Sequence, residues 1–355
     1  MSIRHVLFAI TLVAGLGASG AVAFEIVVPA YFYPSANSGW NAMTAAADDV
    51  DITAIMNPFN GPGGSLDANY VAAVNAFRAA GGRVIGYVYS SYGSRPLAQV
   101  TADIDKYVAW YDIDGIFVDE MANTGPAERL NYYKAIYNHV KDIDAHWEVM
   151  GNPGTHTIEE YLTWPAADRL MVFENVGAQY PGYAPSAWNL NHDRARFVHL
   201  VHTEPSSANM SADVVLAAAR NAGAIYVTGD VLNNPWDTLP TYWQAHVEAV
   251  AQLHASFLSS DFNEDGKVDG DDLAAWRAGY GQFASRARRH HGDATGDGNV
   301  DGVDFLQWQR QAGQTSATAT SSAPRNNALT PEPTSVLIAA AGGLAWIAVA
   351  RSTRR

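Results

Sequence analysis

Two short apolar runs in this 355-residue chain each lead into carboxylates. Residues 115–118 are followed by Asp119 and Glu120, and residues 170–173 are followed by Glu174. A short apolar run that stops abruptly is typical of a strand buried on both faces. Two such strands would place their acids at one edge of a sheet, where paired carboxylates can cleave glycosidic bonds. The alternative is that Asp119 caps a helix or that the acids are simply solvated.

Asp119 and Glu120 are expected to play different parts, because neighbouring strand residues point to opposite faces. We predict that Asp119 is the nucleophile or charge stabiliser, that Glu174 is the general acid/base, and that Glu120 supports them or contacts substrate. A twisted strand end would let Asp119 and Glu120 exchange roles. The acid needs a raised pKa while its partner stays ionised, which apolar surroundings and hydrogen bonds can achieve.

Polar and aromatic side chains at or just beyond other predicted strand ends are candidates for binding substrate. They are Tyr31, Tyr33, Asn57, Tyr89, Tyr92 and Asn152. Tyrosine rings can stack on sugar rings, and side-chain amides can bind hydroxyl groups. Packing or turn chemistry is the alternative for each of them. Asn57-Pro58 and Asn152-Pro153, for example, are also typical of rigid turns.

Eight apolar runs that alternate with helical patterns would position these residues. We predict strands at 26–30, 52–56, 84–88, 115–118, 147–150, 170–173, 197–201 and 224–227, and helices at 66–80, 100–111, 127–143, 208–221 and 242–253. This count and length predict an α/β fold, a (β/α)8 TIM-type barrel over residues 24–258. An open doubly wound sheet is the alternative, but no glycine-rich phosphate fingerprint follows the first strand. In a barrel the active site lies at the carboxyl ends of the strands, where the candidate residues fall.

Composition narrows the class of function. The net charge of −14 argues against a nucleic-acid partner, which needs a basic face. The chain has no cysteine, which excludes a disulfide, a thiolate nucleophile and a cysteine-ligated metal. Its 17 tyrosines and 10 tryptophans supply flat side chains that can stack on sugars. No cofactor is expected in the barrel.

A repeated acidic loop predicts a small all-α calcium-binding domain at residues 259–313. Oxygen side chains recur with the spacing that calcium loops use, and glycine stands at the sixth position of both loops. A short helix follows each loop, at 273–278 and 305–309. Thr295 is a weaker ligand than the Asn263 that matches it, so we expect the second site to be the weaker one. The predicted Ca²⁺ ligands are Asp261, Asn263, Asp265, Lys267, Asp269 and Asp272 in the first loop, and Asp293, Thr295, Asp297, Asn299, Asp301 and Asp304 in the second.

Both ends of the chain carry targeting patterns. Residues 1–23 are typical of a secretory signal peptide, with basic residues, an apolar run and a small-residue cleavage site. Residues 314–330 are typical of a flexible linker. Residues 331–355 combine Pro-Glu-Pro, a short apolar run and a basic tail, which predicts export with transient membrane association. A permanent anchor is the alternative.

Removal of the C-terminal segment is a testable expectation. The apolar run is marginal for a permanent span, so we expect a sorting protease to cut near Pro333. Mass spectrometry of the mature protein then finds a C-terminus close to that residue. A final surface or extracellular fraction that still ends in Arg355 would instead identify a permanent anchor.

Three segments resemble known families. Residues 25–255 resemble the spherulin 4 family, which overlaps glycoside hydrolase family 135, in the stretches 28–34, 57–63, 86–93, 114–120, 151–155 and 172–174. Residues 259–312 resemble a type I dockerin, although positions 270–271 and 302–303 lack the Ser/Thr pairs of many cellulosomal dockerins. Residues 331–355 resemble a PEP-CTERM sorting signal.

These resemblances imply activity and partners. The first implies a hydrolase that cuts α-1,4-linked, N-acetylgalactosamine-containing exopolysaccharide, with the acidic residues of the family carried onto Asp119, Glu120 and Glu174. The second implies a cohesin-type partner, which the altered positions leave open. The third implies processing by an exosortase-like enzyme.

The resulting hypothesis is a secreted, endo-acting glycoside hydrolase, with a retaining mechanism favoured. One alternative is a non-catalytic glycan-binding or matrix scaffold protein with a dockerin module. Another is a metal-dependent carbohydrate esterase that uses His199 and His202 as ligands. These two histidines are three residues apart on a strand and are therefore expected to face opposite ways.

Overall fold

The computed structural model describes residues 24–36, 38–125, 127–256, 258–263, 265–282, 291–295 and 299–315. The predicted signal peptide, the sorting segment at 331–355, nearly all of the linker, and Asp297 lie outside the described residues. Within the described ranges, no helix is both long enough and apolar enough to cross a membrane.

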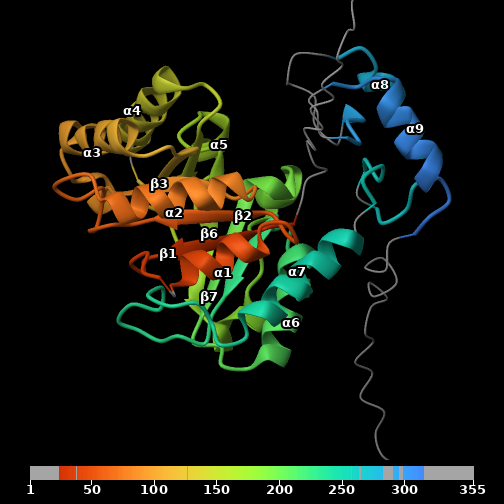
Figure 1. Ribbon diagram of the computed structural model, residues 1–355. Helices are drawn as coiled ribbons and strands as arrows, with labels where there is room; N and C mark the ends of the chain where they lie inside the picture. The colour runs from red at the N-terminus through yellow and green to blue at the C-terminus, as the bar shows by residue number, and fades with distance from the viewer. Residues whose placement is uncertain are drawn as a thin grey trace, which may run out of the picture.

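Eight parallel strands run in sequence order, each hydrogen-bonded to the next. Figure 1 shows strands at the centre of the barrel with helices around them. The strands are β1 (Ile26–Ala30), β2 (Ile52–Met56), β3 (Arg83–Tyr89), β4 (Gly115–Asp119), β5 (Glu148–Gly151), β6 (Arg169–Val176), β7 (Phe197–His202) and β8 (Ala224–Val227). Nearly every strand residue is buried, because helices cover the outer face and side chains fill the interior. All eight predicted strands are present, and the bounds of several differ from the prediction at their ends.

The first and last strands meet beside Glu25. The Glu25 amide donates a hydrogen bond to the Gly223 carbonyl at 3.0 Å, and the Ile225 amide donates to the Glu25 carbonyl at 3.2 Å. Glu25 and Ala224 thereby form a parallel bridge between the two edges of the sheet. The sheet curls into a nearly closed barrel, and the predicted (β/α)8 TIM-type fold is confirmed.

The outer layer consists of α1 (Gly39–Ala46), α2 (Ala68–Ala79), α3 (Leu97–Trp110), α4 (Ala127–Ile143), α5 (Glu160–Thr163), α6 (Ser207–Ala219) and α7 (Trp243–Ser256). Side-chain caps begin some of them: Asp67 accepts a hydrogen bond from the Asn69 amide, and Ser206 accepts one from the Asn209 amide. The sequence patterns missed α1 and α5. Both are short: α5 has four residues, and α1 has eight, of which only Trp40, Met43 and Ala46 are buried.

Short 3₁₀ turns complete the loops of the barrel. They are η1 (Ser91–Gly93), η2 (Gly177–Gly182), η3 (Ala187–Asn191) and η4 (Arg194–Arg196). Strand β6 corrects the predicted strand at 170–173, because it continues through Glu174 to Val176. Its register against β7 shifts between Met171 and Phe173, and beyond the shift Glu174 pairs with Leu200. Glu174 is therefore held inside a strand rather than in a loop beyond one.

In the described residues of the C-terminal module, two helices begin in the same way. Helix α8 (Gly270–Gly279) has a capping box formed by Asp269 and Asp272, and α9 (Gly302–Gln311) has the same box formed by Asp301 and Asp304. Two tryptophans link the repeats reciprocally. Trp276 Nε1 of α8 donates to the carbonyl of Asp301 at 2.9 Å, and Trp308 Nε1 of α9 donates to the carbonyl of Asp269 at 3.1 Å.

Candidate active site

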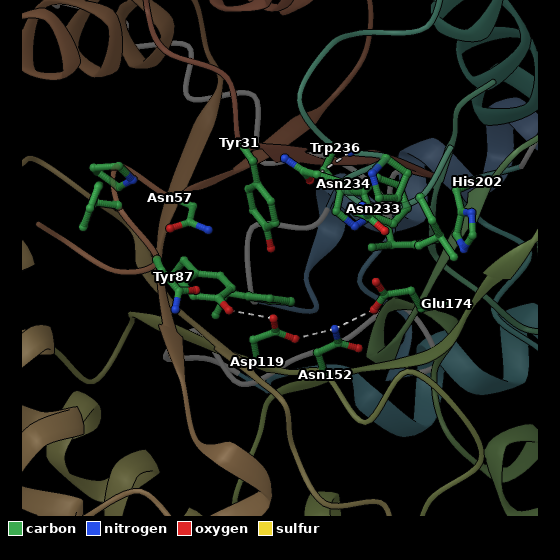
Figure 2. A pocket seen from close by; sticks show the side chains of 17 residues that line it. Tyr31, Asn57, Tyr87, Asp119, Asn152, Glu174, His202, Asn233, Asn234 and Trp236 are labelled. Carbon is green, nitrogen blue, oxygen red and sulfur yellow. Dashed lines mark hydrogen bonds between the residues drawn. The ribbon is translucent and has the colours of Figure 1, made fainter. Parts of the chain in front are cut away.

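A cavity of about 480 Å³ opens at the carboxyl ends of the barrel strands. All eight strands or the loops that follow them contribute side chains to it. In strand order these are Tyr31, Asn57, Tyr87, Asp119, Asn152, Glu174, His202 and Trp236, all of which are labelled in Figure 2. The barrel thus converts eight separate strand ends into one polar cavity with aromatic walls.

One amide group joins the two acids that the sequence singled out. The Asn152 Nδ2 atom donates hydrogen bonds to Asp119 Oδ1 at 2.8 Å and to Glu174 Oε2 at 2.7 Å (Figure 2). Because a single nitrogen lies at these distances from both acceptors, the two carboxylate oxygens are no more than 5.5 Å apart. The strand order explains the bridge, since Asn152 follows β5, which lies between β4 and β6.

Asp119 is also held from the opposite side. Tyr87, in β3, donates from its hydroxyl to Asp119 Oδ2 at 2.8 Å. Burial raises the pKa of the Tyr87 phenol well above its usual range, with the charge of Asp119 as the next largest cause. Tyr87 therefore stays a neutral donor at physiological pH. Both Asp119 oxygens accept a hydrogen bond, which fixes the orientation of the carboxylate.

The environment of Glu174 favours the protonated acid. Burial raises the pKa of Glu174 to about 7, and the neighbouring Asp119 charge adds to the effect. Hydrogen bonds from Asn152 and Trp236 oppose this rise only in part. Burial disfavours an ion, and a like charge nearby disfavours it further. The site thus contains an acid that can hold a proton near neutral pH beside a second, firmly positioned carboxylate.

Some of the predicted substrate-binding residues line the cavity. Tyr31 directs its hydroxyl into it in Figure 2, and its ring meets Tyr87 edge-on, with the ring centres 5.6 Å apart. Burial raises the pKa of Tyr31 well above its usual range, so the phenol remains a neutral hydrogen-bonding group. Asn57 also lines the cavity, but its Oδ1 accepts the Gly61 amide at 2.9 Å. Asn57 therefore both stabilises a turn and lines the cavity.

Four candidates lie elsewhere. Glu120 is not among the cavity-lining residues, and its main-chain carbonyl accepts the Ser90 hydroxyl at 2.7 Å. Tyr33 donates to a carboxylate oxygen of Asp67 at 3.0 Å in a neighbouring hollow. The Arg95 guanidinium covers the Tyr89 ring, 4.0 Å from its centre, and Tyr92 is 61% exposed.

Sequence reasoning missed Tyr87 and Trp236. Tyr87 lies within an apolar strand and resembles a core residue, although it stands two positions before Tyr89 and so shares its face. Trp236 comes from the long loop after β8, where no periodic pattern applies. The cluster of polar residues and proline just before it, 233–235, was the available signal. Both residues reach the site through tertiary placement rather than through a local motif.

The two histidines are separated as expected. His199 is fully buried, where its Nδ1 pairs with the Tyr180 hydroxyl at 2.7 Å, and burial lowers its pKa to about 3. His202 lines the cavity and pairs through Nδ1 with the Thr203 hydroxyl at 2.9 Å. Across the described part of the chain, no three His, Asp or Glu side chains converge on a centre that would hold a metal ion.

The Tyr87 hydroxyl offers a direct test of how Asp119 is positioned. Tyr87→Phe removes one hydrogen bond from the carboxylate and keeps the ring, so we expect kcat on a cleaved glycan to fall about tenfold to a hundredfold. KM should change little, and thermal denaturation should show an intact fold. Tyr92→Phe, on an exposed ring outside the cavity, is the matched control. If Tyr87→Phe and Tyr92→Phe have the same kcat, Tyr87 does not position Asp119.

The acidic loops of the C-terminal module offer oxygen ligands that suit calcium. Asp272 is fully buried and accepts hydrogen bonds from the Phe262, Asn263 and Asp269 amides. Asp304 is equally buried and accepts the matching amides of Ala294, Thr295 and Asp301. Gly266 adopts φ +85° at the sharp turn of the first loop.

These loops therefore fit calcium through the oxygen atoms that they offer and through the sharp turn at glycine. Carboxylate, amide, hydroxyl and carbonyl oxygens are the ligands that calcium selects. Lys267, at the seventh loop position, would contribute its main-chain carbonyl rather than its side chain.

Comparison with known proteins agrees with this division of the chain. Residues 25–250 match Spherulation-specific family 4, and residues 259–312 match the Dockerin type I domain, a type of domain that binds calcium. Spherulin-4 of Physarum polycephalum is 32% identical over 249 residues, which cover 67% of this chain and 73% of that protein.

Among solved structures, Aspergillus clavatus Sph3, crystallised in complex with GalNAc, aligns with a TM-score of 0.58 and 24% identity. The alignment covers 66% of this chain and 99% of Sph3, and it shows that the two proteins share a fold. The family match spans well over half of the chain, and the curated relative is clearly similar in sequence. This chain belongs to Spherulation-specific family 4.

Proposed function

We propose that the barrel is a glycoside hydrolase that uses Asp119 and Glu174 as its two carboxylates. The observation that carries this proposal is the Asn152 bridge, which holds both acids at one cavity. The raised pKa of Glu174, caused mainly by burial, suits a general acid, and the hydrogen-bonded Asp119 suits a nucleophile. Two carboxyl groups with different environments are the pattern that this reaction requires.

The spacing of the acids favours retention of anomeric configuration. Retaining enzymes hold their carboxyl groups about 5–5.5 Å apart, whereas inverting enzymes leave about 6.5–9.5 Å for a water molecule. The Asp119 and Glu174 oxygens that Asn152 bridges lie no more than 5.5 Å apart, and this close approach supports a retaining arrangement. In the first step Asp119 attacks the anomeric carbon while Glu174 gives its proton to the leaving oxygen. In the second step Glu174 takes a proton from water, which displaces Asp119 from the sugar.

We propose the substrate class on the basis of one solved relative. The solved Sph3 structure contains GalNAc. We infer an exopolysaccharide that contains α-1,4-linked (N-acetyl)galactosamine, cut within the chain. Tyr31 and Trp236 supply aromatic walls for a sugar ring, and Asn57 supplies an amide for its hydroxyl groups.

Incubation of the purified protein with galactosamine-rich exopolysaccharide tests this function. We expect new reducing ends, and NMR should show that the first-formed product keeps the anomeric configuration of the substrate. Inverted product would replace the retaining mechanism with an inverting one. Binding of the polysaccharide without any release of reducing ends would favour a non-catalytic glycan-binding protein instead.

The pH dependence of the reaction follows from Glu174. Its carboxyl group is protonated below its pKa of about 7 and ionised above it. Because the free enzyme needs this proton, kcat/KM should fall about tenfold per pH unit above that value. Initial rates from pH 4 to 9 measure the profile, and Glu174→Gln should abolish this basic limb in any residual activity. A wild-type rate that rises through pH 7 would contradict the acid role.

We also propose a setting for the enzyme. The dockerin-like module would dock onto a cohesin-type protein once calcium fills its loops, as the family match suggests. The sequence patterns at both ends support export, followed by sorting through residues 331–355 and removal of that segment by an exosortase-like enzyme. Both the N-terminal and the C-terminal patterns lie outside the described residues.

A further inference from the structure

A second hollow of about 430 Å³ adjoins the catalytic cavity. The two share Pro58 and Phe59, which belong to the loop between β2 and α2. Tyr33 from the loop after β1 and Tyr111 from the end of α3 complete its walls. A chain that lies across the Asp119–Glu174 pair can therefore continue over this loop into the second hollow.

Phe59 stands on the ridge between the two spaces. Phe59 is 84% exposed, which is the highest value among the exposed large hydrophobic residues of the described ranges. The loop that carries it is well ordered by hydrogen bonds: the Phe59 amide donates to the Gly61 carbonyl at 3.0 Å, and Asn57 Oδ1 accepts the Gly61 amide at 2.9 Å. An aromatic ring held in water on a fixed loop suits a binding surface that is ready for a ligand.

Tyr33 presents a second ring whose position is fixed. Its hydroxyl donates to Asp67 at 3.0 Å and accepts from the Asn69 side-chain amide at 2.6 Å. The ring packs edge-on against Tyr70, with the ring centres 5.6 Å apart, and Tyr33 is still 50% exposed. Aromatic faces beside carboxylate and amide groups match the two sides of a sugar, its apolar ring face and its hydroxyl rim.

We propose that this hollow is a remote subsite that holds a sugar unit of the polysaccharide beyond the bond being cleaved. Phe59 and Tyr33 stack on the sugar, and Asp67 accepts a hydrogen bond from its hydroxyl groups. The occupant is the substrate chain itself, because the hollow adjoins the catalytic cavity at Pro58 and Phe59. The proposal rests on the proposed hydrolase function and explains how the site would prefer long chains.

Binding to the inactive enzyme tests the subsite without relying on turnover. The full chain carrying Asp119→Asn is titrated with galactosamine-rich exopolysaccharide, and the titration is repeated after Phe59→Ala or Tyr33→Ala is added. We expect each addition to weaken the polymer affinity about tenfold, and to weaken binding of GalNAc alone by less. Trp164→Ala is the matched control, because Trp164 is 51% exposed and lies just before β6, at the opposite end of the barrel.

The outcomes separate the subsite from the hydrolase. The subsite proposal is overturned if both double variants bind the polymer as tightly as the Asp119→Asn protein does. It is also overturned if the Asp119→Asn protein does not bind the polymer. If wild-type protein releases no reducing ends while Phe59→Ala and Tyr33→Ala still weaken binding, the subsite stands and the hydrolase function fails. Circular dichroism confirms that the exposed substitutions leave the fold intact.

Discussion

Asp119→Asn and Glu174→Gln are each expected to lower kcat on the polysaccharide by roughly three to four orders of magnitude. Asp119→Asn removes the nucleophile, and Glu174→Gln removes the proton that the leaving oxygen requires. Both replacements keep the size and shape of the side chain, so the fold should survive. Reducing-end assays measure the rates, and thermal denaturation checks that each variant is folded.

Glu120→Gln is the discriminating control for this result. Glu120 neighbours Asp119 in sequence but does not line the cavity, so its loss should be far smaller. If Glu120→Gln lowers kcat as much as Asp119→Asn does, the assignment of Asp119 rather than Glu120 as the nucleophile no longer holds. Near-normal activity in Asp119→Asn or Glu174→Gln would remove that residue from the mechanism.

Removal of calcium should unfold the C-terminal module of the full chain. Carboxylates gathered in the two loops repel one another unless a cation lies among them, so metal binding is coupled to folding of residues 259–313. Calorimetry with Ca²⁺ should show a module transition that chelator abolishes, while the barrel transition and the hydrolytic activity remain. Calorimetric traces that are the same with Ca²⁺ and with chelator would refute calcium-coupled folding.

The reciprocal indole hydrogen bonds add a second expectation for this module. Trp276 donates to the carbonyl of Asp301 in the second loop and Trp308 to the carbonyl of Asp269 in the first, so the repeats should melt together. Asp272→Ala removes the buried carboxylate of the first loop and leaves the second loop unchanged. It should nevertheless also weaken calcium binding by the second loop. Tryptophan fluorescence during calcium titration reports this coupling, and two independent binding steps would contradict it.

The barrel was predictable from the sequence because its signals are local. Each strand is a short, nearly continuous apolar run, since a parallel strand covered on both faces needs apolar residues at every position. The strand 224–227, for example, was predicted without any knowledge of its neighbours. The acids after two such runs were equally visible, as were the two acidic loops, whose predicted calcium ligands lie within twelve residues of one another.

The assembly of the cavity was decided only by the tertiary structure. Barrel order places β5 between β4 and β6, which brings the Asn152 amide within hydrogen-bond distance of both acids. Strand β6 continues past a register shift against β7, so that Glu174 lies within the strand and pairs with Leu200, which no local pattern records. Tyr87 and Trp236 belong to the site because of the face and the loop on which they lie.

The sequence pattern also could not predict which way each acidic side chain points. Alternation along a strand predicts that Asp119 and Glu120 diverge, but it cannot say which of them faces the cavity. The structure selects Asp119, whose oxygens meet Tyr87 and Asn152, while the chain turns at Glu120 with φ +50°. Sequence therefore determined which residues stand at the strand ends, and closure of the barrel determined which of them meet, because contacts across strands depend on register rather than on spacing along the chain.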